Sequence, residues 1–206
     1  MEPTILQNPI ADDCLTTLRD KQTRPGAFRA AGRCLSLILA AEAGKLLGTQ
    51  AQEVETPLEL FTGRSLAQGV VLVPILRAGL GMVDAFLELF PNAEIGHVGL
   101  ERNEETAQAG SYYCKLPELL GKQVLLLDPM LATGGSLAMA TDVVKAKGGE
   151  NLAAIAIIAA PEGVEKMHAD HSDVPLILGA LDRELDERKY IRPGLGDYGD
   201  RLMGTH

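Results

Sequence analysis

The residues best suited to chemistry lie in LLLDPMLATGGS, residues 125–136, where an apolar strand ends at Asp128 and a turn enters a helix. That turn offers successive backbone N–H groups, two hydroxyls and the positive end of a helix dipole, and its glycines let an anion approach closely. The spacing indicates a phosphate-binding turn, and a carboxylate at the strand tip is well placed for sugar hydroxyls. An ordinary turn capped by Thr133 or Ser136 is the alternative.

Two arginines occupy similar positions at other strand ends. Arg77 follows the apolar strand in PILRAGLGM, residues 74–82, and Arg102 follows IGHVGLE. A guanidinium in such a place is costly to leave unpaired, so each arginine is expected to meet an anion. A bound phosphate group and an ion pair with one of the protein's own carboxylates would both satisfy this expectation.

The C-terminal segment YIRPGLGDYGDRLMGT, residues 190–205, is rich in Gly and Pro, and we expect no regular secondary structure in it. Its backbone N–H and C=O groups could read the edge of a small planar molecule, although a tail wrapped on the surface is the alternative. The GxGxxG at 194–199 is not a dinucleotide-binding motif, because no strand precedes it and no room is left for a helix.

Other patterns favour no chemistry of their own. Gly134-Gly135 is not followed by Lys, so the turn is not a nucleoside-triphosphate P-loop, and the chain has no GxSxG nucleophile motif. His168 and His171 have HxxH spacing without supporting carboxylates or cysteines, and we expect surface histidines. The charge run DRELDERK, residues 182–189, is typical of a solvated face.

The elements that must position these residues follow from hydrophobic periodicity. Apolar residues recur at helical spacing from about residue 9 to 48, interrupted at Pro25-Gly26 and followed by a polar, β-compatible stretch. From residue 70 on, continuous apolar strands (70–76, 95–100, 123–128, 152–160, 175–181) alternate with helices (79–90, 136–147, 161–170). This pattern predicts an α/β fold with a parallel sheet covered by helices on both faces.

Composition narrows the class of protein. The 206 residues include 28 acidic and 19 basic ones, a net charge of −9 without a basic tract, which argues against binding to nucleic acid or to an anionic membrane. Three cysteines without a CxxC pair favour a reduced, cytoplasmic setting. No apolar run approaches the ~20 residues that span a bilayer.

Four motifs in this order, VPILRAGLGM, RNEET, LDPMLATGGS and YIRPGLGDYGDR, resemble those of the type I phosphoribosyltransferases and, among them, of the uracil phosphoribosyltransferase family. The resemblance runs from about residue 70 to the C-terminus, with a fainter echo at LRDKQTRPGAFR. It implies one domain over residues 1–206: a type I phosphoribosyltransferase-like parallel sheet flanked by helices, a helical N-terminal segment (1–50) and a uracil-binding hood (182–206). Residues 102–115 are polar and break the strand–helix alternation, so we expect a flexible loop or hairpin there that could close over PRPP.

The resemblance also implies a reaction and the residues that carry it. Uracil and 5-phospho-α-D-ribose 1-diphosphate (PRPP) would give UMP and diphosphate with Mg²⁺, a pentosyl transfer of pyrimidine salvage. Catalytic positions would be Arg77, Arg102, Asp128 and Asp197. PRPP would meet these four together with Pro129, Met130, Leu131, Ala132, Thr133, Gly134, Gly135 and Ser136. Uracil would be bound by Ile191, Gly196, Asp197 and Tyr198, the last through its backbone.

Pro129 departs from the two adjacent acidic residues of many type I relatives, so Mg²⁺ is expected to be held by diphosphate and water rather than by a protein cage. The resemblance further implies a homodimer or a higher homo-oligomer. Two rivals are an RNA-binding regulator, which the acidic charge disfavours, and a purine or orotate phosphoribosyltransferase, which GLGDYGD disfavours. A purely structural role would leave the Arg, Gly and Asp clusters unexplained.

Overall fold

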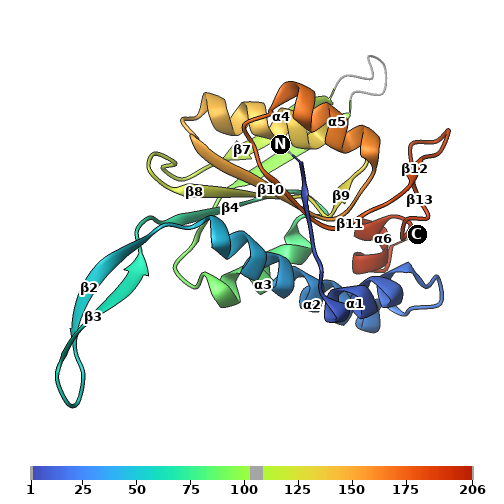
Figure 1. Ribbon diagram of the computed structural model, residues 1–206. Helices are drawn as coiled ribbons and strands as arrows, with labels where there is room; N and C mark the ends of the chain where they lie inside the picture. Colours follow the sequence, from blue (N-terminus) through green and yellow to red (C-terminus); the bar gives the residue numbers. More distant parts are fainter. Residues whose placement is uncertain (1, 103–108, 206) are drawn as a thin grey trace.

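The structure is a computed structural model, and it describes residues 2–102 and 109–205 (Figure 1). Its central sheet runs in the order β1-β11-β10-β8-β4-β6-β7, with β5 pairing β4 and β9 pairing β10. All of these pairs are parallel except β6 with β7. The strands are β1 (Thr4–Ile5), β4 (Val70–Leu76), β5 (Glu94–Ile95), β6 (His97–Arg102), β7 (Ala109–Lys115), β8 (Gln123–Leu127), β9 (Met130–Leu131), β10 (Asn151–Ala159) and β11 (Leu176–Leu181).

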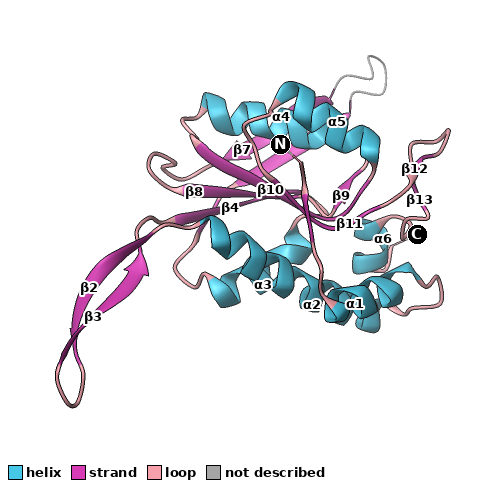
Figure 2. Cartoon of the chain, viewed as in Figure 1, coloured by secondary structure: helices cyan, strands magenta, loops and turns pink. Residues whose placement is uncertain are grey.

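Helices cover both faces of this sheet (Figure 2), as expected for continuous apolar strands. The helices are α1 (Pro9–Arg19), α2 (Pro25–Ala43), α3 (Leu80–Leu89), α4 (Gly135–Ala146), α5 (Pro161–Asp170) and α6 (Tyr198–Met203), with a 3₁₀ turn η1 (Gly44–Leu46) after α2. Alternate residues of β4 serve the two cores: Val70 and Leu72 pack with α1, α2 and α3, while Val71 and Val73 pack with α4 and α5. The α/β prediction is confirmed.

Local signals explain where several helices begin. Pro occupies the first position of α1, α2 and α5, where its missing N–H costs no helical hydrogen bond. Asn8 caps α1, its side chain accepting from the backbone N–H of Ile10 at 2.9 Å. These boundaries agree with the break expected at Pro25-Gly26.

A hairpin of β2 (Thr49–Glu55) and β3 (Leu60–Leu66) projects from the body of the protein (Figure 1). The strands pair antiparallel from Thr49 with Leu66 to Glu55 with Leu60. Every residue of β2 is exposed, and the sequence indicated only a β-compatible stretch here. A strand exposed on both faces has no hydrophobic alternation by which it could be recognised.

The segment expected as a loop or hairpin, residues 102–115, begins at the last residue of β6 and includes β7, which pairs antiparallel with β6. Residues 103–108 lie outside the described part of the chain. The C-terminal expectation was wrong in part. Two short strands, β12 (Glu184–Leu185) and β13 (Ile191–Arg192), pair antiparallel, and the helix α6 follows them. Asp197 starts α6 by accepting from the N–H of Asp200 at 2.9 Å, so an N-cap outweighs the low helix propensity of Gly199.

Candidate active site

The expected phosphate-binding turn joins β8 to α4. Gly134 adopts a left-handed conformation (φ 78°) directly before the helix, and the first turn of α4 contains no acidic residue. The N–H of Gly135 contacts the Thr133 hydroxyl at 3.5 Å, and Ser136 is exposed. The turn therefore combines the positive end of a 12-residue helix with accessible hydroxyls, which is an anion-binding arrangement.

The middle of the predicted PRPP segment differs from a simple loop. Met130 and Leu131 form β9 and pair with Ile158 and Ala159 of β10. Leu131 is buried in the core, and the carbonyl of Pro129 accepts from the N–H groups of Ile157 and Ile158, each at 3.1 Å. These residues therefore fix the path of the backbone. Because the side chains of Pro129 and Leu131 are buried, we expect neither side chain to contact a ligand.

Asp128 directly follows the last residue of β8, at the strand end that the sequence predicted, and its side chain is half-buried. Burial raises the pKa of its carboxyl to about 6, and the weak hydrogen bond from the N–H of Met130 at 3.4 Å opposes the rise. An ionised carboxylate short of partners at the edge of the sheet is an acceptor ready for hydroxyl donors.

Arg77 lies in the turn between β4 and α3, exposed, after a cis peptide bond from Leu76. Among the side chains that the structure describes, its guanidinium has no ion-pair partner. It lines a pocket of about 270 Å³ together with Asp197 and Asp200. Among these described side chains, Arg77 therefore does not form the internal ion pair that was its alternative. Arg77 and Asp197, which are distant in sequence, line one cavity.

Close contacts bring the three clusters together. A Cβ at Gly79 would stand 2.3 Å from the carbonyl oxygen of Leu127, so the arginine turn packs directly on the residue before Asp128. The backbone N–H of Tyr198 donates to the sulfur of Met130 at 3.4 Å. The turn after β4, the turn after β8 and the start of α6 thus meet at one edge of the sheet.

The predicted uracil-binding residues surround this edge in different ways. Ile191 is buried in β13, Gly196 has a positive φ of 80°, and Asp197 lines the Arg77 pocket. The Tyr198 ring is buried against Phe28, with ring centroids 5.2 Å apart, and burial raises the pKa of its hydroxyl. A side-chain contact from Tyr198 to a ligand in the Arg77 pocket is excluded by this burial, in keeping with the expected backbone contact.

Arg102 is the last residue of β6, and its side chain is outside the described part of the structure. The backbone places it on a strand that neighbours β4, with Leu76 opposite Gly99. Its expected role at the diphosphate stays a prediction.

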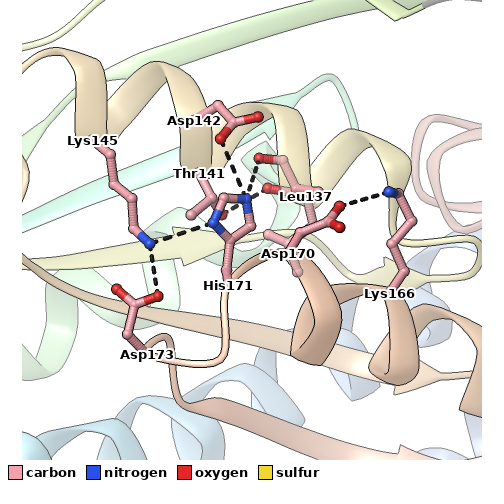
Figure 3. Close-up of polar contacts among 9 residues, drawn as sticks. Leu137, Thr141, Asp142, Lys145, Lys166, Asp170, His171 and Asp173 are labelled. Atoms are coloured by element: carbon pink, nitrogen blue, oxygen red, sulfur yellow. Dashed lines mark hydrogen bonds and ion pairs between the residues drawn. The ribbon is translucent and has the colours of Figure 1, made fainter.

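The histidine expectation was wrong for His171, which is buried beneath α4 (Figure 3). One ring nitrogen lies 3.1 Å from the carbonyl oxygen of Ala138, and the other lies 3.3 Å from Nζ of Lys145, which pairs with Asp173 at 2.8 Å. His171 therefore ties the end of α5 to the helix that carries the phosphate turn. Within the described residues, no three His, Cys, Asp or Glu side chains gather as a metal site.

Sequence reasoning also missed Asp182, which opens the charge run but is buried. Its side chain pairs with Arg19 at 2.5 Å. The resemblance of LRDKQTRPGAFR to the family was the available signal, because that segment contains Arg19.

Comparisons with known proteins agree with this architecture. Residues 5–205 match the family model described as uracil phosphoribosyltransferase. The uracil phosphoribosyltransferases of Salinibacter ruber and Symbiobacterium thermophilum are each 46% identical over 203 residues, covering 98% of this chain and 97% of theirs.

Among solved structures, the AQ2163 protein from Aquifex aeolicus superposes with a TM-score of 0.92 at 38% identity, covering 98% of this chain and 97% of that one. A purine phosphoribosyltransferase from Pyrococcus horikoshii shares the fold alone, with a TM-score of 0.52 at 12% identity over 89% of this chain and 90% of that one. With a matching family model over nearly its whole length, the chain belongs to the uracil phosphoribosyltransferase family.

Proposed function

We propose that this protein transfers the phosphoribosyl group of PRPP to N1 of uracil, giving UMP and diphosphate. The observation that carries the proposal is the shared pocket of Arg77 and Asp197, which joins the β4–α3 turn to the start of α6. The phosphate turn borders it through the Gly79–Leu127 and Met130–Tyr198 contacts. One edge of the sheet thus offers a cation, a carboxylate and a helix N-terminus, matching a diphosphate, a ribose and a 5′-phosphate.

The proposed role of Arg77 follows from the charge changes of the reaction. Breaking the bond from C1′ to the diphosphate leaves positive charge on the ribose ring and negative charge on the leaving group. The guanidinium of Arg77, which has no ion-pair partner among the described side chains, would stabilise that negative charge. Preorganised electrostatic stabilisation of this kind is usually the largest catalytic contribution. Arg102 would act from the neighbouring strand β6.

The 5′-phosphate and the ribose would bind on the other side of this pocket. The phosphate would accept from the N–H groups and hydroxyls at Thr133–Ser136, where the dipole of α4 favours an anion. The Asp128 carboxylate would accept from the ribose hydroxyls, and it stands at the strand tip directly before that turn.

Uracil recognition would rest on the backbone of the C-terminal segment. Uracil presents an N3–H donor between two carbonyl acceptors, whereas N3 of cytosine is an acceptor and its C4 carries a donor. A backbone sequence of N–H, C=O and N–H accepts the first and mismatches the second, and such mismatches discriminate strongly. The positive φ of Gly196, 80°, allows that segment to turn its peptide groups toward a ligand.

The donor set at this edge suits Mg²⁺ carried by the substrate. Asp128 is a single carboxylate followed by Pro129, and Mg²⁺ keeps several waters and prefers phosphate oxygens to an all-protein cage. When bound, the ion would neutralise charge on the diphosphate. Asp128 and Asp197 would accept hydrogen bonds from its waters.

The proposal extends to assembly and setting. The β2–β3 hairpin and its turn expose several apolar side chains, among them Leu58 (94%), Leu60 (79%) and Phe61 (57%). Such exposed apolar surface supports a homodimer or a higher homo-oligomer. Three free cysteines support a cytoplasmic setting, and no described helix is long and apolar enough to cross a membrane. We also propose that residues 1–206 form one domain.

One assay tests the proposal. The purified protein is incubated with PRPP, Mg²⁺ and one base at a time (uracil, cytosine, orotate, hypoxanthine), and nucleotide formation is followed by chromatography. We expect UMP from uracil and at least a hundredfold less nucleotide from cytosine, the size of hydrogen-bond discrimination. Nucleotide from hypoxanthine or orotate without UMP would assign a different base, and no nucleotide from any base would refute the proposed transfer.

A further inference from the structure

Arg19 and Asp182 form a bidentate ion pair between two segments 163 residues apart. The Arg19 Nη2–Asp182 Oδ1 distance is 2.5 Å and the Nη1–Oδ2 distance is 2.8 Å. Arg19 ends α1, and Asp182 follows β11 at the carboxyl end of the sheet, where its N–H donates to the carbonyl of Ala159 at 2.8 Å. The Asp182 side chain is 4% exposed and that of Arg19 is 26% exposed, so water screens this pair poorly.

The pair closes on Gly194 from both sides. Arg19 Nη1 donates to the carbonyl oxygen of Gly194 at 2.9 Å, while the N–H of Gly194 donates to Oδ2 of Asp182, also at 2.9 Å. Gly194 has a positive φ of 66°, and a Cβ there would stand 2.1 Å from the carbonyl oxygen of Ile191. The position and direction of this peptide unit are therefore fixed by two side chains from elsewhere in the fold.

A second guanidinium holds the next residue. Arg201 donates to the carbonyl oxygens of Leu195 at 2.7 Å, Asp20 at 2.6 Å and Leu18, and it stacks over the Phe28 ring with 4.4 Å to the centroid. The end of α1 and residues 194–195 are thus joined by both arginines. Gly196 and Asp197, the residues proposed for uracil and for the Arg77 pocket, come directly after this anchor.

We propose that Arg19 and Asp182 are positioning residues for base recognition: by clamping Gly194 they hold the backbone that reads uracil, without touching the substrate themselves. This inference rests on the proposed function and deepens it. The clamp contacts the segment after β13. The phosphate turn has anchors of its own: it leads into α4, follows β9, which pairs with β10, and packs against Gly163 of α5. Losing the clamp is therefore expected to weaken the use of uracil far more than the use of PRPP.

The test compares Arg19→Lys, Arg19→Gln and Asp182→Asn with the full wild-type chain. Lys keeps the charge opposite Asp182 but cannot make the bidentate pair and reach Gly194 as well. We expect KM for uracil to rise by about tenfold or more in Arg19→Gln and Asp182→Asn, less in Arg19→Lys, because small displacements of positioning groups have effects of this size. KM for PRPP should stay within about threefold on the same grounds.

Lys45→Gln is the matched control, because it removes a cation from the exposed pair with Glu42, at the end of α2 and in the 3₁₀ turn that follows it. It should change neither KM. Hydrogen exchange supplies a readout without turnover: the amides of residues 194–198 should exchange faster in Arg19→Lys than in wild type, while those of 134–138 should not.

The outcomes separate the two proposals. Wild-type protein that forms no UMP refutes the proposed function and this inference with it. If the wild-type protein forms UMP and Arg19→Lys leaves KM for uracil unchanged, only the proposed positioning role of Arg19 and Asp182 is refuted. Equal rises in both KM values across the variants would show a general structural role, which also overturns the inference. If Arg19→Gln fails to fold, Arg19→Lys decides by its two KM values and its exchange pattern.

Discussion

The sulfur of Met130 accepts a hydrogen bond from the backbone N–H of Tyr198 at 3.4 Å. Met130 belongs to the segment between Asp128 and the phosphate turn, and Tyr198 begins α6 directly after Asp197. The two proposed half-sites, one for the phosphoribosyl group and one for the base, are therefore in direct contact. Each segment is also held by contacts of its own, since Met130 pairs in β9 with β10 and residues 194–195 bond to Arg19, Asp182 and Arg201.

Substituting Arg77 by Ala should reduce kcat/KM without weakening the fold. The guanidinium is exposed and unpaired among the described side chains, so its removal leaves no buried charge. Loss of charge-assisted hydrogen bonds of about 1.5–3 kcal/mol corresponds to a decrease of roughly 10- to 150-fold. Steady-state kinetics with thermal unfolding as the folding control measure this, and a decrease below about threefold would remove Arg77 from the site.

Activity should fall in acid as Asp128 becomes protonated. Its pKa of about 6 is raised by burial, and a protonated carboxyl accepts hydroxyl donors less well than a carboxylate. We expect kcat/KM for PRPP to decrease as the pH falls through about 6. Asp128→Asn should be much less active and should lack this acidic limb. An unchanged limb in that variant would assign the titration to another group.

The same carboxyl should lower stability at neutral pH. The folded-state pKa lies above the unfolded value of 3.8, so the native state binds more protons between that pH and about 6. Stability therefore falls as pH rises across this window, and the cost stays constant above it. Asp128→Asn should be more stable than wild type at pH 7.5 by up to about 3 kcal/mol and by little near pH 4. Urea unfolding at the two pH values checks this, and a pH-independent difference would contradict it.

Gly163 of α5 should determine the position of the phosphate turn, although it is not part of that turn. A Cβ there would stand 2.5 Å from the carbonyl oxygen of Ala132, and a Cβ at Gly134 would stand 2.9 Å from that of Gly163. Gly163→Ala should therefore displace the turn and raise KM for PRPP by about tenfold, with a smaller effect on KM for uracil.

Gly26→Ala is the control for this experiment, because nothing lies within 4 Å of a Cβ at that helical position. It adds the same methyl group and should leave both kinetic constants unchanged. If Gly163→Ala behaved like Gly26→Ala, the close packing of α5 on the turn would have no bearing on phosphate binding.

Replacing Leu60 and Phe61 together by Ser should lower the molar mass of the assembly in solution. Both side chains are exposed on the projecting hairpin, and burying them against a second copy is the proposed reason for their presence. Light scattering after size-exclusion chromatography measures the change, with Thr62→Ala on the same strand as control. A wild-type protein that is already monomeric would refute the proposed assembly.

Much of the fold could be read from local patterns. Continuous apolar runs predicted the buried strands β4 (Val70–Leu76), β8 (Gln123–Leu127) and β10 (Asn151–Ala159). The helices α3, α4 and α5 begin and end within a residue or two of their expected bounds. Asp128 and the turn at Gly134 were found because strand, carboxylate and glycine-rich turn are neighbours in the sequence. Local chemistry of this kind needs no knowledge of tertiary packing.

What escaped prediction depends on contacts between distant segments. Asp182 belongs to a charged run, and only Arg19, 163 residues away, explains its burial. His171 similarly is buried because α4 lies over it and offers the carbonyl of Ala138. The two-residue strand β9 is set by pairing with β10 rather than by its own composition. Asp197 is a cap signal for α6, but the Gly and Pro residues around it favour irregular structure.

The position of β1 has a consequence for synthesis. Thr4 and Ile5 pair with Ile177 and Leu178 of β11, so β1 cannot pair until more than 170 further residues have been synthesised. Until then, Leu18 and Phe28, which the finished protein buries with Tyr198, have no complete core to enter. During synthesis the apolar faces of α1 and α2 therefore lack part of the core that they finally enter, and exposed apolar surface of this kind favours chaperone capture and aggregation. Truncation near the C-terminus would return the N-terminal helices to that condition.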